Sequence, residues 1–344
     1  MNFKLTLQNA SRLALLFLTL VVIGAVLAVQ FAGPMTVFQR NLGAGADFLP
    51  QWVVLCDGYN PFHYAPRRCT KLIDCVYSKM TQVQVADTAI GATIAGLLPT
   101  MLVLLAPPLD ELIQQGLVAP HRAVALSCFS IGVPMGVFKH LTPFRERPGL
   151  APASEVVEWE LHFAVLSSTR WLHMLIKIIG DAIIMACTAV VIWKVWAINK
   201  AVMVPWKCET PVMAFSWTIG CMFWVVFALL LLHSMVAELR FEEPGNSSVT
   251  YRWWEVWSLP YTLRSRQGSQ ELQGIKVVWE MPQAPWYRTS LVYKCVMEVF
   301  AAASYFYGTV VWLSALFLGA VNALQYVSLT VGMFVVVRIT SGTV

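Results

Sequence analysis

Long apolar runs almost free of charged side chains recur along this sequence, and they constrain its fold more than any other feature. An α-helix needs roughly 20 apolar residues to cross about 30 Å of hydrocarbon. The composition agrees, because 58% of the 344 residues are hydrophobic and 12% are charged, against roughly 25% charged residues in an average soluble domain. So few charges cannot cover the surface of soluble domains, and the high hydrophobicity excludes a disordered chain. The sequence therefore predicts a polytopic membrane protein.

We expect seven membrane-spanning helices, with six as the alternative count. The third apolar run is short and contains Pro134, whereas the last run, residues 299–337, is nearly twice the length of one span. Two helices with a tight break near Gly319 account for this last run. The expected spans are residues 13–32, 89–106, 123–138, 178–195, 212–232, 296–318 and 320–337. The predicted fold class is an all-α transmembrane helical bundle with a small β or irregular region in its extracytoplasmic loops.

The last expected helix carries a polar stripe. Asn322, Gln325 and Ser328 recur every three residues and so share one helix face. We expect this stripe to pack against neighbouring helices, because the opposite face is long and continuously apolar. The alternative is an amphipathic helix that lies in the plane of the membrane interface.

Two signals disagree about the side of the membrane on which the three long loops lie. These loops, residues 33–88, 139–177 and 233–295, contain most of the basic residues, which the positive-inside rule would place in the cytosol. That rule counts short loops, however, and long loops often translocate regardless of their charge. The three loops also carry acidic residues in comparable number.

Three features favour an outer location for the long loops. Residues 1–12 contain Lys4 and Arg12 and no acidic residue, which predicts a cytosolic N-terminus, and residues 13–32 resemble a signal sequence or anchor. Asn246-Ser-Ser is an N-glycosylation sequon in the third loop. Three lysines lie at the end of the fourth span and in the short connection to the fifth, where a positive-inside signal is expected. They are Lys194, Lys200 and Lys207.

Four cysteines then lie on the outer side, namely Cys56, Cys69, Cys75 and Cys295. In an oxidising compartment they allow two disulfides in three connectivities, among which the sequence does not choose. One hypothesis pairs Cys69 with Cys75 and Cys56 with Cys295. A metal site is disfavoured, because the sequence has no CxxC pair and no histidine at ligand spacing to these cysteines. We expect no metal and no cofactor.

The second and third long loops contain segments with expected secondary structure. Ser154 and the acidic residues that follow it indicate the start of a surface helix. Residues 248–257 and 275–281 are rich in β-forming residues and suit a small hairpin or sheet. Three tryptophans of the first segment favour anchoring at the membrane interface over stacking on a ligand. They are Trp253, Trp254 and Trp257.

Asp181 is the most informative polar residue, because a carboxylate within a span is costly and suggests a function. It is either a proton or cation relay, or a structural partner of Lys177 one turn earlier. Asn322 and Gln325 are the other intramembrane polar candidates, and hydrogen bonding between helices is their simplest role. Asp110 and Glu111, with a histidine, are the only pair suited to an enzyme, and no catalytic motif is present.

Several short segments resemble a family of uncharacterised polytopic integral membrane proteins from filamentous fungi. They are Leu-Ile-Asp-Cys-Val at 72–76, Gly-Leu-Leu-Pro-Thr at 96–100, the apolar block 307–317 and Arg338. The resemblance implies a fungal plasma membrane or secretory pathway and permits a role beside a metabolite gene cluster. The family pattern has Asp where this chain has Asn322, and an Arg inside the last helix where this chain is apolar. It supplies no activity, so no functional residue follows from it.

We therefore expect a non-enzymatic membrane protein of structural, receptor-like or accessory function, with an ordered, disulfide-bonded outer region. Its partners are the lipid bilayer and a small-molecule or protein ligand at the outer loops. A nucleic-acid partner is not expected, because the net charge of +5 comes without a basic stripe. One alternative is a transporter or channel for a small solute or ion. The other is a membrane-embedded enzyme or accessory protein of fungal secondary metabolism.

Overall fold

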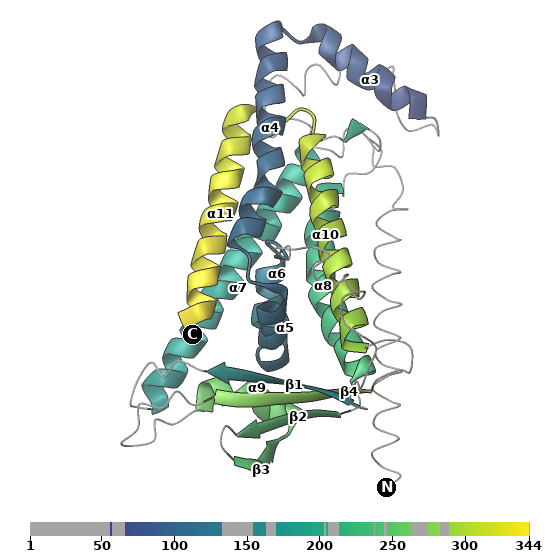
Figure 1. Cartoon of the computed structure of the whole chain (residues 1–344). Coiled ribbons are helices and arrows are strands. Elements are labelled where there is room, and N and C mark those ends of the chain that lie inside the picture. Colours follow the sequence, from purple (N-terminus) through teal and green to yellow (C-terminus); the bar gives the residue numbers. More distant parts are fainter. Residues whose placement is uncertain are drawn as a thin grey trace.

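A bundle of long helices, closed at one end by a four-stranded sheet, forms the described part of the chain (Figure 1). The computed structural model describes residue 56 and residues 66–132, 154–162, 170–202, 204–205, 213–236, 238–243, 246–262, 274–282 and 289–343. The expected first span, residues 13–32, lies outside the described residues. So do residues 133–138 of the expected third span and Lys207.

Five helices of the described residues are long and apolar enough to cross a membrane. They are α4 (Gln82–Leu105), α7 (Arg170–Ala201), α8 (Met213–Met235), α10 (Thr289–Leu313) and α11 (Ala320–Thr343). The shorter helices are α3 (Pro66–Lys79), α5 (Leu109–Val118), α6 (Pro120–Ser127) and α9 (Trp253–Thr262). This architecture confirms a mostly helical protein with a small sheet and supports a membrane location. The described residues hold five such helices, against the seven expected in the whole chain.

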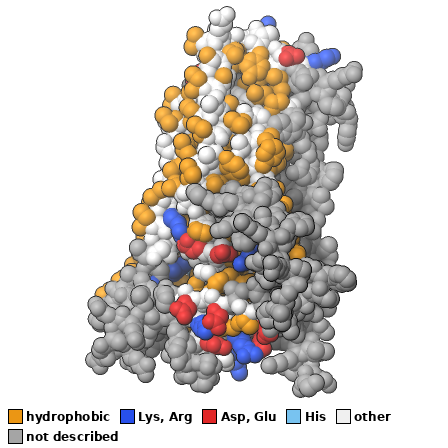
Figure 2. Space-filling model, in the orientation of Figure 1, with side chains coloured by type: hydrophobic (Ala, Val, Ile, Leu, Met, Phe, Trp, Pro, Cys, Tyr) orange, Lys and Arg blue, Asp and Glu red, His pale blue; other side chains and the backbone are white. Residues whose placement is uncertain are grey.

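The outer faces of the long helices are apolar, as a lipid environment requires. Leu104 on α4, Phe306 on α10 and Ile339 on α11 are 72%, 70% and 60% exposed. Hydrophobic side chains cover the upper bundle in Figure 2, whereas the visible Lys, Arg, Asp and Glu gather mainly in its lower part. Such a continuous apolar surface would not suit water and is the expected surface of a helix bundle in a bilayer.

The sheet and helix α3 lie at opposite ends of the bundle (Figure 1). Near its start, α10 contacts the sheet through Tyr293, whose ring lies 6.5 Å from that of Trp279. Just beyond its end, Phe317 contacts Tyr77 of α3 at a ring distance of 5.6 Å. A helix rises 1.5 Å per residue, so the 25 residues of α10 span about 37 Å. This distance exceeds the hydrocarbon thickness, so the two ends face opposite sides of any membrane that the bundle crosses.

Charged contacts border the apolar belt at both ends. Near the α3 end, the Ala320 amide donates a hydrogen bond of 3.2 Å to Asp87 Oδ1. Toward the sheet end, Arg338 Nη2 donates a bond of 2.9 Å to Glu111 Oε2. The helical rise from Ala320 to Arg338 is about 27 Å, close to the roughly 30 Å of a bilayer core. The belt between these contacts therefore has the thickness of a hydrocarbon layer.

The expected third span, residues 123–138, is wrong in its described part. There α6 comprises eight residues and ends at Ser127, which is too short to cross a membrane. The chain then returns toward the end of α4, because a Cβ on Gly132 would lie 2.3 Å from the Pro107 carbonyl oxygen. Thus α5 and α6 form a helical hairpin whose tip lies toward the sheet end, where the Leu117 carbonyl accepts a hydrogen bond of 3.2 Å from Trp257 Nε1 of α9.

The sheet has the strand order β1-β4-β2-β3. Its strands are β1 (Ser154–His162), β2 (Glu238–Glu243), β3 (Asn246–Tyr251) and β4 (Gly274–Pro282). On its inner face Trp159 packs on Trp279 at a ring distance of 5.2 Å, and Trp279 is fully buried. On its outer face Lys276 and Glu158 form an ion pair of 2.9 Å. The sheet therefore has one apolar face on the protein and one charged face toward water.

The helix expected from Ser154 is wrong, because these residues form strand β1. β1 pairs antiparallel with β4, from Ser154 opposite Pro282 to His162 opposite Gly274. The alternation of Glu158, Trp159 and Glu160 has the period of two that a half-buried strand requires. This pairing with a distant segment outweighs the local helix-start signal.

The expected small sheet is present, and β4 covers the predicted residues 275–281. The other expected strand, residues 248–257, is divided between β3 and the helix α9. On α9, Trp253 and Trp257 are 54% and 43% exposed, and their rings pack edge to face at 4.7 Å. These two tryptophans are exposed at the sheet end, and anchoring at the membrane interface stays a prediction.

The last apolar run divides near Gly319, as the sequence predicts. Helix α10 ends at Leu313, α11 begins at Ala320, and Phe317 between them has a φ of 68°. The turn lies directly on α4, since a Cβ on Gly91 would be 1.9 Å from the Leu318 carbonyl oxygen. Only a glycine permits this close approach.

The polar stripe expected to pack inside the bundle mostly faces outward. Gln325 and Ser328 are exposed, and Asn322 is half-buried. The inward face of α11 instead carries Tyr326, which is 3% exposed and packs on Trp312 at a ring distance of 5.2 Å. Large aromatic side chains fill the space between the helices and turn the smaller polar residues outward.

Candidate functional site

Helix α7 turns a polar face toward the protein and an apolar face outward. Its buried polar residues recur at helical spacing, whereas Ile178, Ile179 and Met185 are about half exposed. The buried polar residues are His173, Lys177, Thr188 and Asn199, and the half-buried Asp181 lies on the same face. This arrangement concentrates the polar groups of the span within the bundle.

The part of this polar face near the end of α7 has a structural role. Thr188 Oγ1 donates a hydrogen bond of 2.8 Å to the Ile184 carbonyl in its own helix. Asn199 Oδ1 accepts bonds from the amides of Ala214 and Phe215, at 3.0 and 3.2 Å. These amides belong to the first turn of α8, which has no helical partner for them, so Asn199 satisfies two donors of a helix terminus.

Asp181 lies at the centre of a charged cluster formed by α6, α7 and α9. Arg122 Nε donates to Asp181 Oδ1 at 2.6 Å, and His121 Nε2 lies 3.3 Å from the same oxygen. The Tyr261 hydroxyl donates to Asp181 Oδ2. We call Asp181, Arg122, His121, Tyr261 and Lys177 the boundary cluster, because they lie toward the sheet end of the apolar belt.

Two basic side chains of the boundary cluster, those of Lys177 and Arg122, are buried near the single carboxylate of Asp181. Lys177 is 0% exposed and Arg122 is 5% exposed. Among the described residues, neither Lys177 Nζ nor Arg122 Nη2 has a hydrogen-bond partner. Two basic side chains thus lie near one carboxylate, and two buried donors remain without a hydrogen bond.

The boundary cluster opens toward the surface on the side of α6. The His121 side chain is 40% exposed, whereas those of Asp181 and Arg122 are 15% and 6% exposed. Tyr261 contacts both His121 and Asp181, and burial changes the pKa of its phenol. Burial raises the pKa of the Tyr261 phenol to about 12, and its bond to Asp181 and the charge of that carboxylate add to this effect. The phenol therefore remains a hydrogen-bond donor at neutral pH.

A second ion pair joins the α5–α6 hairpin to the last helix, α11. Arg338 donates to both carboxylate oxygens of Glu111, at 2.5 and 2.9 Å. Gln115 Nε2 also donates to Glu111, at 3.4 Å. The sequence suggests Asp110 and Glu111 as an acid pair for an enzyme, but in the structure both Glu111 oxygens accept bonds from Arg338. This bidentate geometry is typical of a structural contact.

The structure separates the three intramembrane polar candidates. Asp181 belongs to the boundary cluster, with Lys177 one turn earlier as the sequence suggests. Asn322 lies two residues after Ala320, which contacts Asp87 near the opposite end of the bundle. Gln325, one turn after Asn322, is exposed. The three residues therefore do not face a common interior.

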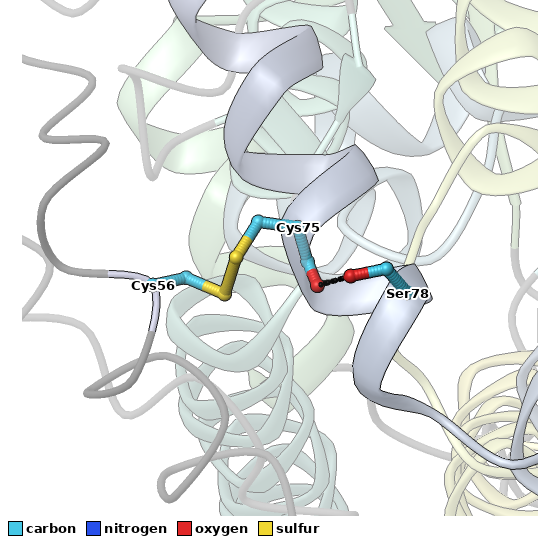
Figure 3. The surroundings of a disulfide bond; sticks show 3 residues. All are labelled: Cys56, Cys75 and Ser78. Atoms are coloured by element: carbon cyan, nitrogen blue, oxygen red, sulfur yellow. Dashed lines mark hydrogen bonds between the residues drawn. A yellow bond between two sulfur atoms is a disulfide. The ribbon is translucent and has the colours of Figure 1, made fainter.

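The disulfide links Cys56 to Cys75 at the α3 end of the bundle (Figure 3). The Cα atoms are 6.1 Å apart, and Ser78 Oγ donates to the Cys75 carbonyl at 2.7 Å. Cys295 is a free thiol in the second turn of α10, at the sheet end. The hypothesis that pairs Cys56 with Cys295 and Cys69 with Cys75 is therefore not what the structure contains. Most of the length of α10 separates Cys295 from Cys56.

The remaining predicted site residue is Asn246, which begins strand β3 at the sheet end. It therefore lies at the opposite end of the bundle from the disulfide. Within the described ranges, no three His, Cys, Asp or Glu side chains come close enough together to hold a metal ion.

Comparisons with protein-family models, with curated proteins and with solved structures found no match. The boundary cluster is the described site whose chemistry best suits a ligand. Arg122, His121 and Tyr261 are not among the residues that the sequence singles out. The one available signal is Arg122 at the start of an apolar run, and only the folded chain brings it to Asp181.

Proposed function

We propose that the chain is a non-enzymatic, receptor-like or accessory membrane protein with its sheet in the cytosol and its disulfide on the oxidising side. The observation that carries this proposal is the separation of Cys56–Cys75 from the sheet by the length of the bundle. Stable disulfides belong to the secretory pathway and the cell surface. The plasma membrane or a secretory compartment follows as the proposed location.

This orientation revises the expectation that all three long loops lie outside. Because α6 does not cross the membrane, the strands of the second and third loops are opposite the disulfide. Basic residues near the belt support a cytosolic sheet end, among them Arg122, Lys177 and Arg338. Lys194 and Lys200 near the other end of α7 give the opposite signal. The redox requirement of a disulfide is the stricter constraint, so it decides the proposed orientation.

A receptor-like or accessory role is supported by the way in which the sheet joins the bundle. Strand β2 begins at Glu238, three residues after α8 ends at Met235. The inner face of the sheet is buried, and Trp279 contacts Tyr293 of α10. A change in the positions of α8 and α10 would therefore move the sheet, whose charged outer face is available to a protein or small-molecule partner.

The experiment is cysteine accessibility in sealed microsomes. Glu158→Cys places a thiol on the exposed face of β1, and Lys79→Cys places one at the end of α3. An impermeant maleimide should label the first from the cytosolic side and the second only after the membrane is opened. Labelling in the reverse pattern, or of both thiols from one side, contradicts the proposal.

A transporter is the second candidate, and the buried polar face of α7 is the observation that favours it. Within that face, Thr188 and Asn199 have structural hydrogen bonds, so a transport role rests on the boundary cluster. Asp181→Asn in proteoliposomes tests it, with Glu158→Gln as a control on the sheet surface. Loss of a solute or ion flux in the first variant alone, in protein that remains folded at the assay temperature, supports transport. Equal flux in both removes Asp181 from any such role.

A further inference from the structure

The buried amine of Lys177 lies near the carboxylate of Asp181 but is not hydrogen-bonded to it. Lys177 is 0% exposed, and its Nζ makes no hydrogen bond within the described residues. Burying an ammonium group without a partner opposes folding, because the charge loses its hydration. A bound ligand that supplied this missing partner would offset the cost of burying the ammonium group.

The charge balance of the boundary cluster identifies the sign of that ligand. Asp181 is the acidic side chain that acts on Lys177, and Arg122 is the nearby cation. Asp181 already accepts hydrogen bonds from Arg122 and Tyr261 and contacts His121. The Lys177 amine and Arg122 Nη2 are left as unpaired donors on cationic side chains. An anion that reached both donors would satisfy them and balance the extra positive charge.

We infer that the boundary cluster is a binding site for a phosphate group, carried by a lipid headgroup or by a free phosphate, with Lys177 and Arg122 as its direct ligands. An arginine fork together with a lysine point charge is a common combination for phosphate. The site lies toward the end of the apolar belt, at the depth where lipid headgroups begin. Basic sites between transmembrane helices in this position bind anionic headgroups in other proteins.

The surroundings provide a path for such a group. His121 is the most exposed of the cluster residues that contact Asp181, with 40% of its side chain accessible. Tyr261 OH lies 3.4 Å from His121 Nε2 and is carried by α9. The same short helix has the exposed Trp253 and Trp257. The exposed edge of the cluster, at His121 beside α9, is therefore the side from which a headgroup at the interface can approach. This inference does not depend on which side of the membrane the sheet faces.

The test measures the thermal unfolding midpoint of the full chain with two sources of phosphate. In one arm the protein is in nanodiscs of phosphatidylcholine, with or without phosphatidic acid. In the other it is in neutral detergent, with inorganic phosphate or with chloride at equal ionic strength. Native mass spectrometry of the detergent sample counts the phosphatidic acid molecules that remain bound. The variants are Lys177→Met and, as a matched control on the same helix, Lys194→Met.

We expect phosphate to raise the midpoint of the wild type and of Lys194→Met, and to have little effect on Lys177→Met. Without phosphate, Lys177→Met should itself have a higher midpoint, because it removes an unpaired buried charge. The apparent affinity should fall by about tenfold or more in Lys177→Met, the usual effect of losing a charged hydrogen bond. His121→Ala, at the half-exposed edge, gives the second test if Lys177→Met does not fold.

The two arms distinguish the sources of phosphate. A rise with phosphatidic acid alone assigns the site to a lipid headgroup, and a rise with inorganic phosphate alone assigns it to a free phosphate. Two results would overturn the inference. One is no change with either source in the wild type, and the other is the same change in Lys177→Met as in the wild type.

Discussion

Arg122 Nε lies 2.6 Å from Asp181 Oδ1, although 59 residues separate the two in sequence. Arg122 belongs to the α5–α6 hairpin and Asp181 to the inner face of α7, so their contact holds the hairpin against α7. Tyr261 adds α9 to the same carboxylate. One acidic side chain thus joins the three elements that form the sheet end of the bundle.

Asp181→Asn should strongly destabilise the protein, because it leaves the buried guanidinium of Arg122 without its charged partner. Breaking a buried ion pair in this way costs about 3–5 kcal/mol of unfolding free energy. Thermal or denaturant unfolding in detergent measures the change. The control is Glu158→Gln, which removes the solvent-exposed pair with Lys276 and should have a much smaller effect, because water screens that pair. Equal losses in the two variants would show that the contact with Arg122 contributes no more than a surface pair.

Glu111→Gln should loosen the hairpin from α11, because Arg338 loses a bidentate carboxylate. The pair is half-exposed, so we expect a loss of about 1–2 kcal/mol in unfolding free energy. Exchanging the two charges in the double variant Glu111→Arg, Arg338→Glu should restore part of this stability. If the double variant is as unstable as the sum of the single substitutions, the ion pair is not the source of the effect.

The raised pKa of the Tyr261 phenol predicts that the folded protein loses stability at alkaline pH. Its pKa is about 12 in the folded protein and near 10.0 when unperturbed. The unfolded chain therefore releases this proton first, and stability falls as pH rises from about 10 toward 12. The thermal unfolding midpoint of Tyr261→Phe should fall less steeply over this window than that of the wild type. Parallel pH profiles would mean that Tyr261 ionises equally in both states.

Two glycines give a matched test of the packing of the bundle. A Cβ on Gly308 would lie 2.4 Å from Trp217 Nε1, whereas nothing lies within 4 Å of one on Gly332. Gly308→Ala should therefore destabilise the protein by roughly 1–3 kcal/mol through overpacking. Gly332→Ala should be neutral or stabilise the protein by up to about 1 kcal/mol, because alanine favours a helix. Unfolding midpoints compare the two, and a neutral Gly308→Ala would contradict the close packing of α8 on α10.

The long helices could be predicted from the sequence, because the hydropathy and length of a segment depend on local residues alone. The break near Gly319 follows from the same reasoning, since its run is too long for one span. The orientation of α11 did not follow, because it depends on which side chains fit between neighbours. The spacing of Asn322 and Gln325 predicted a buried polar face on α11. The buried face instead carries the aromatic side chain of Tyr326.

The errors arose where distant segments decide local structure. Strand β1 carries a plausible helix-start signal, and its pairing with β4, more than 100 residues later, decides the outcome. The hairpin α5–α6 has enough apolar residues for part of a span. The chain nevertheless folds back after α6, so that Gly132 lies against Pro107 near the end of α4. Asp181 was recognisable as unusual from its position in an apolar run. Its partners Arg122 and Tyr261 were not, because no short-range pattern links them.

The most direct test of the proposed orientation is glycosylation in cells that glycosylate secreted proteins. Lys79→Asn creates an acceptor sequon with Met80 and Thr81 at the end of α3, whereas Asn246 with Ser247 and Ser248 lies in the sheet. We predict that the variant gains one glycan removable by endoglycosidase and that the wild type carries none on Asn246. A glycan on Asn246 in the wild type, with none gained by Lys79→Asn, would contradict a cytosolic sheet and an outer disulfide.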